Sequence, residues 1–231
     1  MKTIGLIGGM SWESSLEYYR VINEETKLQL GDTHSAECLM YSFDFHYVDK
    51  LQHKGDWKKL TDEMVKQASN LKKAGAEFIV ICTNTMHLMA GSIEEKTGLK
   101  VLHIADAAGE EIKRKGLTKV ALLGTKFTMQ GDFYKSVLRE RHNIEVIVPN
   151  ESDMMIIHNI IYKELILGKI DSLSKMKYVE IINKLQSEGA QGVILGCTEI
   201  PLLVKQEDVS IPVFDTATIH SKAAVRYSLT K

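Results

Sequence analysis

Short apolar runs alternate along the chain with longer segments in which apolar residues recur every three or four positions. Residues 78–82 are apolar throughout, which predicts a strand buried on both faces. Residues 57–73 place Leu60, Met64 and Leu71 at helical spacing. Alternating strands and helices predict parallel sheets joined by right-handed crossovers, so the predicted fold class is α/β.

The predicted elements form two series along the chain. In the first series we expect strands at 3–7, 37–45 and 78–82, and helices at 14–30, 57–73 and 86–96. In the second series we expect a short strand at 101–104, strands at 120–123, 144–148, 192–195 and 213, and helices at 107–115, 128–141, 156–167, 175–188 and 216–228.

The two series are related by an internal repeat. LKKAGAEFIVICTNT (71–85) aligns with LQSEGAQGVILGCTE (185–199), and this alignment places Thr83 over Cys197, 114 positions later. Each half thus ends an apolar strand with a small side chain that can carry a proton. Two such groups facing each other suit a reaction that moves a proton from one face of a carbon to the other.

A second pair of segments gives nearly the same spacing. IGLIGGMS (4–11) aligns with VALLGTKF (120–127), 116 positions later. We therefore expect two similar flavodoxin-like parallel-sheet domains, related by an approximate two-fold axis, with an active site in the cleft between them. The expected domains are residues 1–98 plus 210–231, and residues 99–209.

Composition narrows the class of protein. The formal charge of the 231 residues is −1, and no basic stretch suggests a nucleic-acid partner. No apolar run approaches the roughly 20 residues of a membrane span, and the first residues lack a signal-peptide layout. Three cysteines without pairing or zinc-finger spacing predict a reducing compartment, the cytoplasm, and no structural metal.

Polar turns follow four of the predicted strands, at 8–11, 83–85, 124–125 and 197–199. Ligands of parallel α/β sheets bind beyond the carboxyl ends of the strands. We expect each turn to precede a helix N-terminus, whose free N–H groups favour an anion. The glycines at 5, 8 and 9 do not form the GxGxxG pattern of a dinucleotide site.

Cys197 and Thr83 are the residues best suited to proton transfer. At a helix N-terminus, the pKa of the Cys197 thiol should fall from about 8.5 towards neutral. The alternative is a small apolar filler, as buried cysteines often are. The Thr83 hydroxyl is a far weaker base and is better suited to delivering a proton. Its alternative is a helix cap.

Three other side chains have both a functional and a structural interpretation. His87 and His220 each lie just past a polar turn and could orient a catalytic group, or they could be hydrogen-bonded structural residues. Glu199 could tune the thiol or bind an ammonium group, or it could be a first-turn acid favoured by the helix dipole. We expect Cys38 and Cys82 to serve packing.

Five segments resemble one known family, the cofactor-independent aspartate/glutamate racemases. They are GLIGGMSWESSLEYY (5–19), CTNTMH (82–87), LLGTKFTM (122–129), GCTEI (196–200) and FDTATIH (214–220). The resemblance implies two similar α/β domains, catalysis by two facing cysteines without pyridoxal phosphate or metal, and a homodimer. Here Thr83 replaces the first cysteine, which is typical of a branch of the family with a strong preference for L-aspartate and L-glutamate.

The resemblance also implies the roles of site residues. Thr83 and Cys197 are the expected catalytic pair. The expected substrate ligands are Met10, Gln52, Asn84, Thr85, Thr125, Thr128, Thr198 and Glu199. The motif around Gln52 is less distinctive than the others, and Glu199 is included because it lies two residues after Cys197. For the basic side chain that holds the distal carboxylate, three alternatives stay open: Lys163, His53 and Lys54.

The leading hypothesis is a racemase that interconverts L- and D-aspartate or glutamate without a cofactor. A second hypothesis is a decarboxylase or maleate-type isomerase of the same fold that uses one cysteine. A third is a non-catalytic protein that binds acidic amino acids. Exchange of the substrate α-proton with solvent distinguishes the first from the third, and release of carbon dioxide identifies a decarboxylase.

Overall fold

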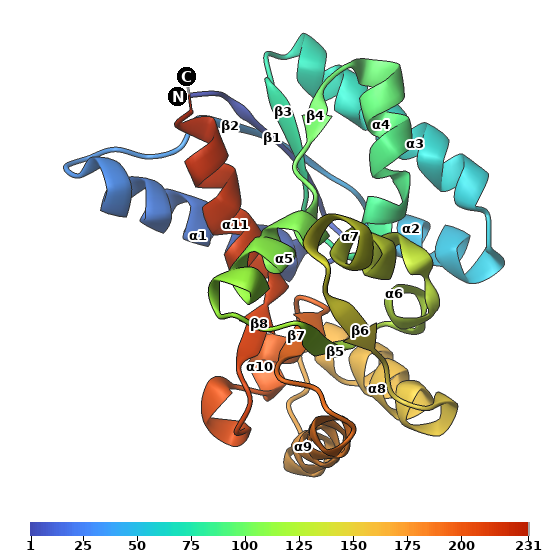
Figure 1. Cartoon of the computed structure of the whole chain (residues 1–231). Coiled ribbons are helices and arrows are strands. Elements are labelled where there is room, and N and C mark those ends of the chain that lie inside the picture. Colours follow the sequence, from blue (N-terminus) through green and yellow to red (C-terminus); the bar gives the residue numbers. More distant parts are fainter. Residues whose placement is uncertain (231) are drawn as a thin grey trace. The chain divides into compact units, whose positions relative to one another are not determined.

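The chain forms two parallel four-stranded sheets (Figure 1) in a computed structural model that describes residues 1–230. The first sheet has the order β2-β1-β3-β4, with bounds Cys38–Ser42, Ile4–Gly8, Phe78–Ile81 and Lys100–Val101. The second has the order β6-β5-β7-β8, with bounds Glu145–Ile147, Lys119–Gly124, Val193–Gly196 and Val213–Asp215. The predicted α/β class is confirmed.

The register of the strands confirms the internal repeat. In the first sheet Ile7 pairs with Ile81, and in the second Leu123 pairs with Leu195. Ile81 and Leu195 are equivalent in the alignment that places Thr83 over Cys197, and Ile7 and Leu123 are equivalent in the second alignment. The repeated sequence therefore corresponds to a repeated strand order and a repeated register.

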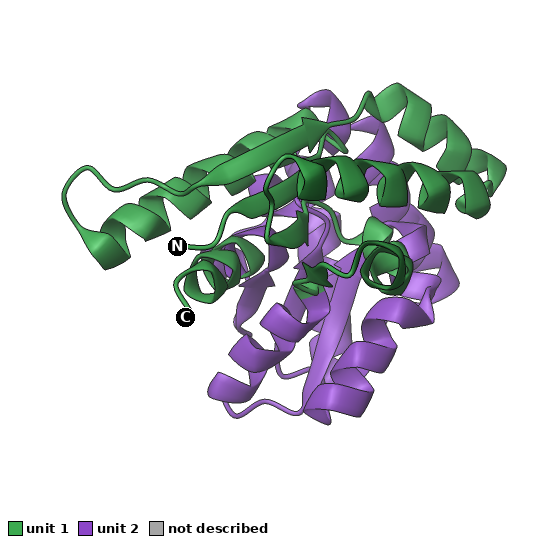
Figure 2. Ribbon diagram, turned by 90° about the horizontal axis from the view of Figure 1, so that it is seen from above, with its two compact units in different colours: residues 1–104, 220–231 green, residues 105–219 purple. Residues whose placement is uncertain are grey.

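Two compact units divide the chain (Figure 2). Unit 1 comprises residues 1–104 and 220–231, and unit 2 comprises residues 105–219. The helix after β4 thus belongs almost entirely to unit 2, whereas most of the helix after β8 belongs to unit 1. The division expected from the repeat, with boundaries at 98 and 210, stays a prediction.

Helices cover both faces of the first sheet. They are α1 (Trp12–Leu30), α2 (Phe45–Lys54), α3 (Trp57–Lys73), the 3₁₀ helix η1 (Thr85–Met89), α4 (Ala90–Thr97) and α11 (Thr216–Ser228). On one face α2, α3 and α4 pack on Ile7, Ile79 and Ile81 in a continuous apolar core. On the other face the ring of Phe78 meets Tyr227 of α11 with centroids 4.8 Å apart.

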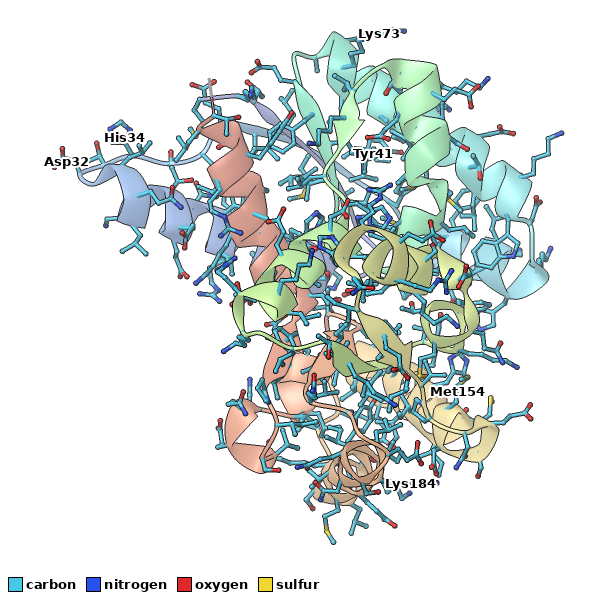
Figure 3. The ribbon with its side chains drawn as sticks, in the orientation of Figure 1. Asp32, His34, Tyr41, Lys73, Met154 and Lys184 are labelled. Carbon is cyan, nitrogen blue, oxygen red and sulfur yellow. The ribbon has the colours of Figure 1, made fainter. Side chains whose placement is uncertain are left out.

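The second sheet is built in the same way. Its helices are α5 (Ile104–Arg114), α6 (Lys126–Gln130), α7 (Asp132–His142), α8 (Glu151–Lys163), η2 (Leu165–Leu167), α9 (Ser172–Ser187), α10 (Ile200–Leu203) and η3 (Gln206–Asp208). Figure 3 labels Met154 on α8 and Lys184 on α9. Met154 lies in the apolar core of this unit, and Lys184 forms an ion pair with Asp153 of α8 at 2.8 Å. Among residues 1–230, no helix has the length and apolar character needed to cross a bilayer.

The expected helices are present, but several segments differ from prediction. The helix expected at 156–167 ends at Lys163 and is followed by the 3₁₀ turn η2. The strand expected at 37–45 ends at Ser42, because Asp44 caps a helix that the prediction lacked, α2. The helix expected at 128–141 is broken at Gly131, whose extended backbone separates α6 from α7. The helix expected at 86–96 begins as the 3₁₀ turn η1. Local caps and turns, rather than hydrophobic periodicity, decide these boundaries.

The turn after β1 depends on Gly9. Its φ is +82°, and a Cβ added there would lie 2.2 Å from the carbonyl oxygen of Phe43. Phe43 in turn donates its N–H to the carbonyl of Gly8 at 3.0 Å. The glycine therefore allows the chain after β1 to pass directly against the chain after β2.

We expect Gly9→Ala to lower the free energy of unfolding by roughly 2–5 kcal/mol, from left-handed backbone strain plus the clash with Phe43. The matched control is Gly55→Ala, where φ is +70° and ψ is 19°, in the left-handed region, but nothing lies within 4 Å of the added Cβ. That change should cost only the strain, about 1–2 kcal/mol. Urea unfolding of both variants measures the difference, and equal losses would contradict a packing role for Gly9.

Candidate functional site

In unit 1, the polar residues gather beyond the carboxyl ends of β1 and β3. Thr83 is partly exposed, while the side chains of Asn84 and Thr85 are buried. Cys82 is completely buried, as its alternation with Thr83 along the chain predicts. Thr83 is thus the residue of this segment that solvent or a ligand can reach.

Hydrogen bonds hold the end of β3 in place. Ser14, in the first turn of α1, donates its hydroxyl to the carbonyl of Cys82 at 2.9 Å. Nδ1 of His87 lies 2.8 Å from the carbonyl of Thr83. A carbonyl can only accept, so this nitrogen carries a proton. The backbone of Thr83 is therefore tied to the turn that follows it, and His87 serves to position it.

His220 has two fixed partners in the same unit. Its Nε2 lies 2.7 Å from the carbonyl of Leu102, so Nε2 donates and Nδ1 accepts from the hydroxyl of Tyr18 at 2.8 Å. Burial, followed by the nearby charge of His87, lowers the pKa of His220 from 6.5 to about 3. A neutral, completely buried imidazole with both nitrogens engaged supports the structural interpretation of this residue.

In unit 2, two glycines allow β5 and β7 to approach closely at their carboxyl ends. Gly124 pairs with Gly196, and a Cβ on Gly124 would lie 2.8 Å from the carbonyl oxygen of Gly196. Thr125 caps α6 by accepting the N–H of Thr128 at 3.3 Å. The two threonine hydroxyls lie 3.2 Å apart, and Thr128 is completely buried.

Cys197 follows β7 and is hydrogen-bonded to Glu199. The thiol donates to Oε2 of Glu199 at 3.0 Å, and the hydroxyl of Thr198 donates to the same oxygen at 2.9 Å. Glu199 is 6% exposed, whereas Cys197 and Thr198 are partly exposed. The structure thus supports the interpretation in which Glu199 tunes the thiol.

The expected direction of the Cys197 pKa shift is wrong. Burial, followed by the negative charge of Glu199, raises the pKa of the thiol well above its usual value. The helix that follows, α10, has only four residues, so few peptide dipoles are aligned to favour a thiolate. A neighbouring carboxylate and desolvation outweigh so short a helix.

Two other polar turns also precede short helices, in which few peptide dipoles are aligned. The turn at 83–85 leads into the 3₁₀ helix η1, and the turn at 124–125 leads into the five-residue α6. Only the turn at 8–11 precedes a long helix, α1, where Ser11 accepts the N–H of Ser14 at 3.3 Å. Each of the four turns therefore precedes a helix, as expected, although three of these helices are short, and anion binding at the turns stays a prediction.

The Cys197–Glu199 pair is suited to acid–base chemistry. A thiol that donates to a carboxylate can transfer its proton to that carboxylate and become a base. The reverse transfer regenerates the thiol. Among residues 1–230, no three His, Cys, Asp or Glu side chains lie close enough together to hold a metal ion.

Comparison with known proteins places these residues in a family. Residues 7–224 match the sequence model of the Asp/Glu/hydantoin racemases. The chain belongs to the Asp/Glu/hydantoin racemase family. It is 25% identical over 230 residues to the broad specificity amino-acid racemase RacX of Bacillus subtilis, with 96% of each chain covered.

Solved structures of this racemase family resemble the chain over its whole length. A protein from Yersinia pestis described as a candidate Asp/Glu racemase is 52% identical, with a TM-score of 0.93 and full coverage of both chains. An aspartate racemase homologue from Pyrococcus horikoshii is 38% identical, with a TM-score of 0.86 and full coverage of both. The two-domain racemase fold is therefore confirmed.

Within this racemase-family chain, the predicted site residues fall into two groups. Unit 1 holds Met10, Thr83, Asn84 and Thr85 beyond β1 and β3, with Gln52 buried on α2. Unit 2 holds Thr125, Thr128, Cys197, Thr198 and Glu199 beyond β5 and β7. Their roles stay predictions. The three basic alternatives, Lys163, His53 and Lys54, are all exposed, so burial does not distinguish them.

His158 is a residue that sequence reasoning missed. Its Nδ1 accepts the backbone N–H of Lys126, the first residue of α6, at 3.2 Å. Its ring packs near Tyr162 and Phe127, with centroids 4.7 and 6.2 Å away. From α8 it therefore fixes the start of the turn that carries Thr125 and Thr128. Only the three-dimensional contact identifies it, since 32 residues separate His158 from Lys126.

We expect Glu199→Gln to accelerate alkylation of Cys197 by iodoacetamide between pH 7 and 9. The substitution removes the negative charge that helps to raise the thiol pKa, so more thiolate is present at a given pH. Mass spectrometry of the Cys197 peptide measures the rate, with the exposed Glu207→Gln as the charge-matched control. Unchanged or slower alkylation in Glu199→Gln alone would show that the carboxylate does not hold the thiol protonated.

We expect His158→Phe to speed hydrogen exchange at the Lys126 amide, because the ring is kept but the acceptor is lost. A hydrogen bond of about 1 kcal/mol corresponds to roughly a fivefold change. His158→Asn restores an acceptor and should reverse much of the effect. If Thr125 and Thr128 hold the substrate, KM should rise in His158→Phe more than kcat falls. Unaltered Lys126 exchange would show that the capping bond is not formed in solution.

Proposed function

We propose that the chain is an amino-acid racemase that interconverts L- and D-aspartate or glutamate without pyridoxal phosphate or metal. Cys197 acts on one face of the substrate Cα and Thr83 on the other. For this reaction both groups must reach the same carbon from opposite sides. The observation that carries the proposal is the hydrogen bond from Cys197 to Glu199, which gives the thiol a proton acceptor of its own.

The first half-reaction removes the α-proton of the L-substrate. The Cys197 thiol passes its proton to Glu199, and the resulting thiolate takes the α-proton, so Cys197 is a neutral thiol again. The electron pair of the broken C–H bond moves into the α-carboxylate as enolate-like charge. Hydrogen-bond donors at Asn84, Thr85 and Thr198 stabilise that charge. The proton on Glu199 leaves to water.

The second half-reaction delivers a proton to the opposite face. The Thr83 hydroxyl gives its proton to the carbanion and regains one from water, so no net proton is consumed. A threonine hydroxyl is a poor base, so the reverse entry from the D-substrate is the slower one. This asymmetry agrees with the preference for L-substrates that the family resemblance implies.

The remaining predicted ligands complete the proposal. Met10 in unit 1 and Thr125 and Thr128 in unit 2 are buried residues at or just after the polar turns, and Gln52 is buried on α2. All four are proposed to shape the substrate site. A homodimer is a separate part of the proposal, since none of the proton transfers requires a second chain.

Replacement of the two catalytic residues tests the proposal. Cys197→Ala should abolish exchange of the L-substrate α-proton into deuterated water, a loss of at least roughly 10²–10⁴-fold. Thr83→Ala should retain that exchange but lose inversion, because removal of the proton uses the other face. Thr83→Cys adds a group that ionises near neutral pH and should improve turnover of D-substrates. Proton NMR and chiral chromatography measure exchange and inversion separately.

Three results would contradict the proposal. Racemisation unchanged in Thr83→Ala, together with no gain in Thr83→Cys, would reduce Thr83 to a helix cap. Carbon dioxide release from a malonate, without exchange on any amino acid, would identify a single-cysteine decarboxylase. Tight stereospecific binding of aspartate or glutamate without exchange would identify a binding protein.

A further inference from the structure

An uncharged apolar surface lies on unit 1, where α1 meets β2. Trp12, Leu16 and Tyr19 follow one another at spacings of four and three, so they share one face of α1. They are 63, 58 and 49% exposed, and Met40 of β2 is 40% exposed. We call these four residues the α1–β2 patch. Large apolar side chains gathered in this way on a folded unit mark an interaction surface.

A hollow of about 390 Å³ lies within the patch. Besides the four patch residues, it is lined by Ser15, Cys38 and Ser42. None of the seven lining residues carries a formal charge at neutral pH, although 26% of the chain is charged. Charged residues are depleted from the centres of protein interfaces in the same way.

The backbone of β2 adds hydrogen-bonding groups to this surface. β2 is an edge strand that pairs with β1 alone. Glu37 accepts from Ile4, and Phe43 donates to Gly8, so the odd-numbered residues of this segment bond towards β1. In a parallel pair the N–H and C=O groups of alternate residues point to opposite sides. Those of Cys38, Met40 and Ser42 therefore point outward.

We propose that the α1–β2 patch binds a second copy of this chain. Two β2 strands pair antiparallel about a two-fold axis at Met40, and the apolar faces of the two α1 helices meet over the joined strands. In this register Met40 lies opposite Met40 of the other copy, and Cys38 lies opposite Ser42. The interface extends the homodimer of the proposed function by naming its surface, and it is independent of the proton chemistry.

The exposed area supports a second copy as the occupant. Given the ~150–250 Å² that an aromatic side chain can bury, the four patch side chains leave about 400–500 Å² open to solvent. A standard interface buries ~800 Å² on each partner, of which a little over half is non-polar. The patch therefore supplies the apolar part of one such interface.

The sequence of the edge strand β2 and the charged residues beside the α1–β2 patch are also compatible with pairing of two copies. Edge strands that must stay unpaired are protected by lysine, proline or a bulge, and Cys38–Ser42 (CLMYS) contains neither lysine nor proline. At the border, Arg20 already pairs with Glu17 and Glu24 of its own helix. The charge of Arg20 is therefore balanced within its own helix, and the surface beside the patch does not require a partner of opposite charge. In the loop between α1 and β2, where Figure 3 labels Asp32 and His34, residues 31–35 are exposed.

A matched pair of leucines on α1 tests the apolar half of the proposal. Leu16 is in the patch, whereas Leu28, at 78% exposure, faces about the opposite side of the helix. Sedimentation should give twice the mass of the 26.0 kDa chain for the wild type and for Leu28→Glu. Leu16→Glu should sediment as a monomer and weaken association at least 100-fold. Circular dichroism checks that both variants fold, and Met40→Lys repeats the test from the strand.

Cross-linking tests the strand pairing. Ser42→Cys places a thiol opposite the natural Cys38 of the other copy, at the separation of about 5.5 Å between Cα atoms that a disulfide accepts. Mild oxidation should join Ser42→Cys into covalent dimers that resist denaturant. Ser35→Cys, exposed just before β2, is the control and should give few.

A wild-type monomer at 100 µM would overturn the proposal. A dimer that Leu16→Glu and Leu28→Glu affect equally would also overturn it, because the interface would then lie elsewhere. A dimer in which Ser42→Cys cross-links no better than Ser35→Cys would exclude the strand pairing. Proton exchange assays on the same samples are read separately, so failure of the racemase proposal and failure of this one are distinguishable.

Discussion

The close approach of the two central strands in each sheet is the constraint on which the rest of the structure depends. Parallel pairing places both carboxyl ends at one edge, so the turns that follow β1 and β3, or β5 and β7, emerge side by side. In the second sheet Gly124 and Gly196 leave no room for a side chain between β5 and β7, and in the first Gly9 leaves none between the chain after β1 and the chain after β2. Every proposed site residue except Gln52 follows from that arrangement.

The surroundings of Cys197 in unit 2 differ from those of Thr83 in unit 1, and the proposed chemistry depends on this difference. In unit 2 the carboxylate of Glu199 and burial keep the Cys197 thiol protonated, yet the same carboxylate offers a place for the proton. In unit 1 the carbonyl of Thr83 is hydrogen-bonded to His87, and a threonine hydroxyl ionises far less readily than a thiol. In the proposed mechanism, the duplicated fold thus carries two unequal groups, Cys197 as the base and Thr83 as the proton donor.

The edge strand β2, which the fold leaves unpaired on one side, points to an interaction surface. In the first sheet α1 and β2 leave an uncharged surface, while its centre is covered on both faces. Apolar area is costly to leave in water, and the unpaired backbone groups of an edge strand can pair with a strand of another chain. The second copy that we propose would cover the apolar area and pair the backbone groups at one surface.

The sequence by itself determined the fold class, the repeat and the motif positions, because these depend on local periodicity and on matches along the chain. The strand register, which pairs Ile7 with Ile81 and Leu123 with Leu195, confirms the alignment of the two halves of the chain. Only the tertiary structure decided the direction of the Cys197 pKa shift, the capping role of His158 and the exposure of the β2 edge. These three features depend on which groups come into contact in the folded chain and on the lengths of the helices. The spacing of residues in the sequence does not determine either.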